Sequence, residues 1–167
     1  KIELLMKQAK ISVDMRTTVQ AANDLAAATG APAAAMELPD GTIVTGKTSN
    51  LLGSSAALIL NAVKALGNIG HEVHLIAPSA IEPIQKLKVN YLGSKNPRLH
   101  TDEVLIALSM CAATDPTAQN ALNQLSKLKG CQVHTSVMLS DVDINVFKKL
   151  GVDLTSEPVY EERKIYH

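Results

Sequence analysis

The chain has 167 residues, of which 46% are apolar and 19% charged, enough for one globular domain with a core. Its 16 basic residues balance 16 acidic ones and only 2% are aromatic, which argues against a nucleic-acid or anionic-membrane surface. No apolar run reaches the roughly 18 residues of a membrane span, and no signal peptide opens the chain. Two cysteines make no disulfide framework, so we expect a cytoplasmic protein.

The first expected elements are a helix and a β-hairpin. Residues 19–30 carry apolar side chains at helical spacing, behind Thr17 or Thr18 as the cap. Strands are predicted at 32–38 and 42–46, because a Pro-Asp-Gly turn separates two short runs that suit extended backbone.

After the hairpin, strands and helices alternate. The sequence predicts a buried helix at 51–66, a strand at 72–78, a helix at 79–89, a loop at 90–100, helices at 102–113 and 116–129, a strand at 131–139, a helix at 142–150 and a last strand or extended tail at 152–160. The predicted helix caps are Ser49 or Asn50, Ser79 with Glu82, Thr101, Asp115, and Ser140 or Asp141. This order predicts a single α/β domain over 1–167, a three-layer α-β-α sandwich with a mixed sheet.

The stretch 41–48 matches the phosphate-loop pattern G-x-x-x-x-G-K-T. A true phosphate loop curls its backbone around an anion, whereas the β-branched run Thr-Ile-Val-Thr inside this stretch favours an extended backbone. We therefore expect the match to be accidental. Lys47, Thr48 and Ser49 remain candidate anion ligands, because they lie where a strand passes to a helix N-terminus.

The densest polar cluster lies in the loop that enters the helix at 102–113. Its candidate ligand-binding residues are Asn96, Arg98, His100, Thr101, Asp102 and Glu103. Arg98 offers a planar fork for phosphate or carboxylate, and His100 titrates near neutral pH. Asp102 or Glu103 could orient His100 or act as a base. The alternative is that the residues after His100 only start a helix.

Metal and nucleophile patterns are weak in this sequence. Cys131 and His134 are three residues apart, and on a strand such residues face opposite sides, so we interpret both as structural. No Gly-x-Ser-x-Gly elbow occurs. We expect no metal site, and the sequence identifies neither a catalytic residue nor a cofactor.

The order of elements resembles the cytidine deaminase-like fold: a helix, a hairpin with Asp-Gly, a short polar loop and a buried helix. In deaminases the buried helix begins with a zinc ligand beside a catalytic glutamate, and a later helix supplies P-C-x-x-C. Here Ser54, Ser55 and Ala56 stand near the first position, and P-C-x-x-C is missing. The resemblance therefore implies the fold without zinc and without deaminase chemistry.

A closer resemblance covers nearly the whole chain. The stretches ELPDGTIVTGKTSNLLGSSAALILNAVKAL, NPRLHTDEVLIALS and LGVDLTSEP are similar to the C-terminal domain of uncharacterised protein family 0371, a family of large bacterial proteins with a domain of unknown function. The resemblance, together with a first residue that is not Met, implies the C-terminal part of a longer chain whose N-terminal domain is a partner.

We expect the domain to bind a small anionic ligand or to pack against the N-terminal domain. The predicted binding surface joins the corner at 47–49 to the loop at 96–103, since both lie at helix N-termini. One alternative is part of a nucleotide-dependent transferase or hydrolase that the N-terminal domain completes, with Arg98 and His100 essential. Another is a structural or homo-oligomerising module, and a metal enzyme is the weakest option.

Overall fold

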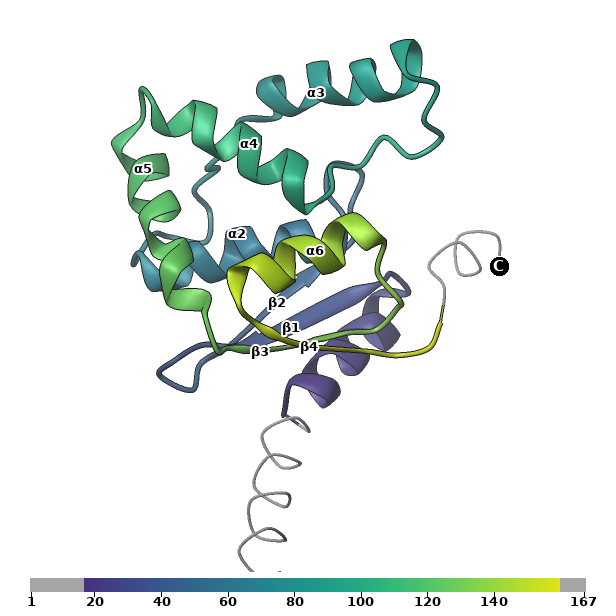
Figure 1. Ribbon diagram of the computed structural model, residues 1–167, viewed down its shortest axis with the longest axis vertical. Coiled ribbons are helices and arrows are strands. Elements are labelled where there is room, and N and C mark those ends of the chain that lie inside the picture. Colours follow the sequence, from purple (N-terminus) through teal and green to yellow (C-terminus); the bar gives the residue numbers. More distant parts are fainter. Residues whose placement is uncertain (1–16, 160–167) are drawn as a thin grey trace, which may run out of the picture.

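The computed structural model in Figure 1 describes residues 17–159. The elements follow in order as a helix at 17–29, β1 (Ala33–Glu37), β2 (Ile43–Lys47), α2 (Ser54–Leu66), α3 (Pro78–Lys86), the π-helix η1 (Leu87–Tyr91), α4 (Thr101–Ala112), α5 (Pro116–Asn123), the 3-10 helix η2 (Gln124–Leu128), β3 (Gln132–Thr135), α6 (Asp141–Leu150) and β4 (Asp153–Ser156). The ends of the expected domain 1–167, and residue 160 of the expected last element, lie outside the described residues.

One four-stranded mixed sheet forms the middle layer, in the order β2-β1-β3-β4. Strand β1 runs antiparallel to β2 and β3, whereas β3 and β4 are parallel. The helix at 17–29 lies on one side of the sheet, and α2 and α6 lie on the other (Figure 1). The predicted three-layer α/β architecture with a mixed sheet is confirmed, and the hairpin precedes the buried helix as in the deaminase-like order.

Strand β1 divides its side chains between the two layers. Ala34 and Met36 belong to the main core beneath α2. Ala33 and Ala35 are equally buried, and they face the opposite side because side chains alternate along a strand. The helix at 17–29 meets that side with small buried residues such as Ala22, so it can approach the sheet closely.

The hairpin settles the backbone geometry of the phosphate-loop match. Gly41 adopts a left-handed φ of 88°, and the N–H of Leu38 donates to the Thr42 carbonyl across the turn. Residues 43–47 pair with β1 as an antiparallel strand. The prediction of an extended backbone is confirmed for 43–45. A phosphate loop also needs a helix that starts at its lysine, whereas α2 begins only at Ser54.

The predicted strand at 72–78 is wrong. This segment forms turns, with the N–H of Val73 donating to the Gly70 carbonyl, and it ends where Pro78 opens α3. Leu75 and Ile76 are neighbours and both are buried in the one main core. Neighbouring side chains on a strand point to opposite faces, so an irregular backbone is needed to bury both on one side.

Three predicted helix starts need correction. Helix α2 begins at Ser54 with Gly53 as its cap, so neither Ser49 nor Asn50 caps it. Ala77 caps α3 without a side-chain hydrogen bond, so the predicted box of Ser79 and Glu82 is wrong. His100, not Thr101, is the N-cap of α4. In each case a loop held by tertiary contacts or a proline moved the start from the nearest good capping residue.

Two predicted caps are confirmed. The Asp115 side chain accepts the N–H of Thr117 at the start of α5, and the Ser140 side chain accepts the N–H of Asp143 in α6. Among residues 17–159, no helix combines the length and the apolar character that crossing a membrane requires.

Candidate functional site

The loop before α4 is joined edge to edge with the loop before α2. The N–H of Leu99 donates to the Leu51 carbonyl at 3.0 Å, and the N–H of Gly53 donates to the Leu99 carbonyl at 3.1 Å. Leu99 is fully buried. Arg98 and His100 flank Leu99 in the chain, and both are half-buried.

Arg98 connects the two loops through its side chain. Its Nε donates to the Ser49 carbonyl at 2.6 Å. The Ser49 hydroxyl accepts the N–H groups of Leu51 and Leu52, and the Thr48 hydroxyl accepts the N–H of Ser54 at 3.2 Å. A hydroxyl that accepts still has its own proton to donate. Thr48, Ser49 and Arg98 therefore form one corner whose hydroxyl groups and guanidinium can still donate hydrogen bonds.

His100 is held at the start of α4 by two carboxylates. Its backbone N–H donates to Glu103 Oε1 at 2.8 Å. Its Nδ1 lies 3.8 Å from Asp143 Oδ2, the separation of an ion pair, and its side chain is 35% exposed. Asp143 raises the pKa of His100; burial and Lys88 oppose this rise, while Glu103 adds to it. The net effect is a pKa of His100 above its ordinary value of 6.5.

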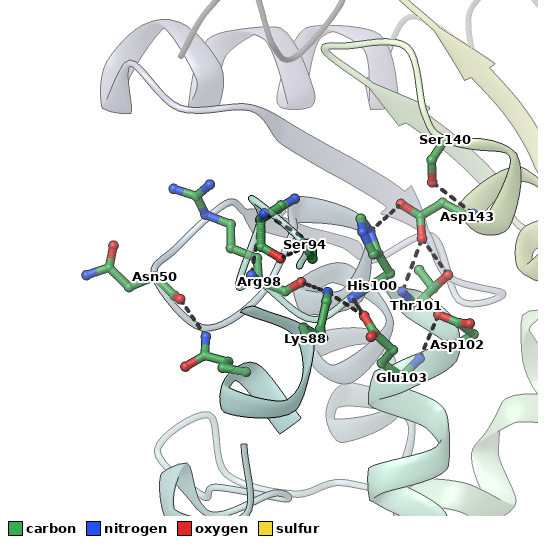
Figure 2. Close-up of polar contacts among 12 residues, drawn as sticks. Asn50, Lys88, Ser94, Arg98, His100, Thr101, Asp102, Glu103, Ser140 and Asp143 are labelled. Carbon is green, nitrogen blue, oxygen red and sulfur yellow. Dashed lines mark hydrogen bonds and ion pairs between the residues drawn. The ribbon is translucent and has the colours of Figure 1, made fainter. Parts of the chain in front are cut away.

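Asp143, on α6, is the buried centre of this network (Figure 2). Its Oδ1 accepts the N–H of Thr101 at 3.1 Å and the Thr101 hydroxyl at 2.7 Å. Burial by itself would raise the pKa of Asp143, yet the interactions with His100 and Thr101 hold the pKa below its ordinary value. Asp143 therefore remains a carboxylate that ties α4 to α6.

Sequence reasoning selected neither Asp143 nor Lys88, which lies on η1. Its Nζ donates to Glu103 Oε1 at 2.8 Å and also to the Arg98 carbonyl, and the side chain is buried (Figure 2). A signal existed: Ile81, Ile84 and Lys88 share one helical face, so the lysine follows two core residues. Asp143 left no comparable signal, since its partners are 42 positions away.

The remaining predicted site residues have local roles or lie elsewhere. Asn96 Oδ1 accepts the N–H of Arg98 at 3.0 Å, and Asp102 Oδ1 accepts the N–H of Glu103 at 2.8 Å. Lys47 is exposed and pairs with Ala33 in the sheet, so its side chain starts on the face away from α2. The structure thus joins Thr48, Ser49 and Arg98 directly, and it does not join Lys47 to them.

A second polar cluster occupies the other face of the sheet. His134 is only 3% exposed, and its Nδ1 lies 2.6 Å from Thr155 Oγ1. Its Nε2 lies 3.1 Å from Glu157 Oε2. Cys131 belongs to the main core on the opposite side, which confirms that Cys131 and His134 face apart. Within 17–159, no three His, Cys, Asp or Glu side chains gather in a way that could hold a metal ion.

The fold is that of a three-layer α/β domain. The chain belongs to the family described as "Domain of unknown function DUF1846, C-terminal", which matches residues 14–166. Over 166 residues it is 53% identical to a UPF0371 protein of Corynebacterium glutamicum (strain R), 54% to one of Corynebacterium efficiens and 51% to one of Streptococcus pyogenes serotype M5.

These matches cover 99% of this chain and 34% of each relative, so the chain spans about a third of their length. The resemblance to family 0371 is confirmed.

Proposed function

We propose that the corner formed by Thr48, Ser49 and Arg98, with His100 next to it at the start of α4, binds a small anionic ligand. The supporting observation is the state of the Arg98 guanidinium. Its Nε is engaged by the Ser49 carbonyl, while its two Nη groups have no hydrogen-bond partner among residues 17–159. An arginine fork held in this way can donate two parallel hydrogen bonds to phosphate or carboxylate.

The local charges favour an anion at this corner. Glu103 is paired with Lys88 at 2.8 Å, and Asp143 faces His100. The two charges within each pair offset each other, whereas no carboxylate in the described residues pairs with Arg98. The N-terminus of α4 adds a partial positive charge beside His100.

The test is a calorimetric titration of the chain with inorganic phosphate and with pyrophosphate. We expect Arg98→Gln to weaken binding by at least about tenfold, because a charge-assisted hydrogen bond is lost. Lys95→Gln, an exposed cation in the same loop, is the matched control. Lys47→Ala tests the remaining predicted ligand, and unchanged affinity would remove it from the site. The proposal is refuted if wild type and Arg98→Gln bind equally.

A second candidate function, packing against another part of a longer chain, has its own observation. Leu87 on η1 is 47% exposed, and Tyr91 and Leu92 are each 71% exposed. Exposed apolar side chains grouped on one segment are typical of an interaction surface. Since the relatives are about three times as long as this chain, the partner we propose is the rest of such a protein.

A further inference from the structure

A row of polar side chains crosses the sheet face under the helix at 17–29. Side-chain alternation puts the following residues on this face: Gln132, His134 and Ser136 from β3 and its extension, and Asp153, Thr155 and Glu157 from β4 and its extension. A sheet face covered by a helix is ordinarily apolar, because buried polar groups are costly unless they are paired. The presence of six polar residues on this face therefore needs a physical explanation.

The centre of the row is a chain of three functional groups. The Glu157 carboxylate lies 3.1 Å from His134 Nε2, the separation of an ion pair without hydrogen-bond geometry, and its negative charge favours the tautomer with the proton on Nε2. In that tautomer Nδ1 has a free lone pair, which can accept the proton of the Thr155 hydroxyl across 2.6 Å in place of the Val133 carbonyl at 3.4 Å. The order hydroxyl, imidazole, carboxylate is that of a nucleophile, its base and the group that orients the base.

Thr155, at one end of this chain of groups, lines a hollow. Half-buried Thr155 lines a cavity of about 300 Å³ together with Thr18, Gln132, Val133, Val152, Asp153 and Leu154. That volume is at the lower end of the range for small-molecule sites, about 300–1,000 Å³. Gln132 Oε1 is buried there without a hydrogen-bond partner among residues 17–159. An unpaired acceptor in the lining of the same cavity suits a ligand that carries an N–H or O–H donor.

Burial lowers the pKa of His134, and Glu157 opposes this shift only partly. The imidazole is therefore neutral near pH 7, as a base must be before it accepts a proton.

We propose that Thr155 is a nucleophile for acyl transfer from a small ester, with His134 as its base and Glu157 as a positioning residue. Thr155 Oγ1 bonds to the acyl carbon while its proton moves to His134 Nδ1. The ester C–O bond breaks, and the departing alcohol takes the proton from His134. Water, deprotonated in turn by His134, then cleaves the acyl-threonine, which releases the carboxylic acid and restores the hydroxyl.

The experiment treats the protein at its full natural length with p-nitrophenyl acetate. It follows nitrophenolate release and maps the acetylated residue by peptide mass spectrometry. We expect an acetyl group on Thr155, none there in Thr155→Val, and a rate at least about 100-fold lower in His134→Gln. Thr155→Ser should restore acetylation at position 155. The wild-type rate should rise with pH through an inflection below 6.5, the ordinary pKa of histidine.

Thr114→Val, which changes an exposed threonine, is the matched control, and thermal unfolding of each variant checks that it folds. Acetylation confined to lysine or cysteine side chains, or an equal rate in Thr155→Val, overturns the proposal. A pH profile with no inflection in the folded wild type also contradicts it. The phosphate titration of Arg98→Gln is independent, because that corner lies at the loops before α2 and α4 and not on this face of the sheet.

Discussion

Asp143 is hydrogen-bonded to Thr101, which lies 42 positions earlier in the chain. Its carboxylate accepts both the backbone and the hydroxyl of Thr101, and it faces the imidazole of His100. At the residue scale, this single buried charge holds the start of α4 and raises the pKa of His100. The loop that carries Arg98 and His100 therefore depends on a residue from another element.

Replacing Asp143 with asparagine should lower the free energy of unfolding by about 1–3 kcal/mol, because a hydrogen-bonded buried charge is lost. The pKa of His100 should also fall, since Asp143 is the main group that raises it. Urea unfolding measures the first effect, and an NMR titration of His100 measures the second. Asp141→Asn, an exposed change in the same helix turn, is the control. An unchanged His100 titration would contradict this account.

The stability gap between wild type and Asp143→Asn should depend on pH. The pKa of His100 is raised above 6.5, so its contribution is complete below 6.5 and is lost as the pH rises through the folded pKa. The pKa of Asp143 is lowered, so its contribution is complete above 3.8 and is lost as the pH falls through the folded pKa.

We therefore expect the widest gap between about pH 3.8 and 6.5, measured as unfolding free energies across the pH range. A gap that stays constant from acid to alkaline pH would show that the pair is not coupled to folding.

At the element scale, the contact between β2 and α2 depends on a glycine. A Cβ at Gly46 would overlap the backbone of Leu58 and Ser54 in α2. Backbone atoms cannot move aside as a flexible side chain does, so the strand and the buried helix would have to separate. Gly46 is also the second glycine of the phosphate-loop match. The close packing of β2 against α2 therefore explains why position 46 is a glycine, without any role in phosphate binding.

We expect Gly46→Ala to destabilise the chain by at least about 2 kcal/mol through this overlap. Gly53→Ala is the matched control, because its added Cβ would meet only the Leu99 carbonyl oxygen at 3.8 Å. That change at a helix cap should cost about 1 kcal/mol or less. Chemical unfolding of both variants makes the comparison, and equal losses would show that the approach of α2 to β2 is not as tight as described.

The candidate site was predictable only where its residues are close in sequence. Arg98 and His100 could be selected because they stand together in a polar loop before a helix. Lys88 and Asp143, which hold that loop through hydrogen bonds, come from η1 and α6. Similarly, His134 gained its partners Thr155 and Glu157 from a strand about twenty positions later.

At the scale of the whole molecule, the apolar residues on η1 point to a further contact. If the rest of a longer chain covers them, Tyr91 and Leu92 should react less with hydroxyl radicals in a protein of the relatives' length than in this chain. Met138, 40% exposed and next to β3, serves as the internal reference. Mass spectrometry of the labelled peptides measures the ratio, and equal labelling of Tyr91 in both proteins would refute packing at this surface.

The sequence by itself determined the features that depend only on residues close together in the chain. The Pro-Asp-Gly turn set the hairpin, and Asp115 and Ser140 set the starts of α5 and α6. Tertiary structure alone decided that 72–78 is not a strand, that α2 starts at Ser54, and that Lys88 and Asp143 support His100. Capping and turn energies act over a few residues, whereas burial and ion pairing depend on which distant segments meet in space.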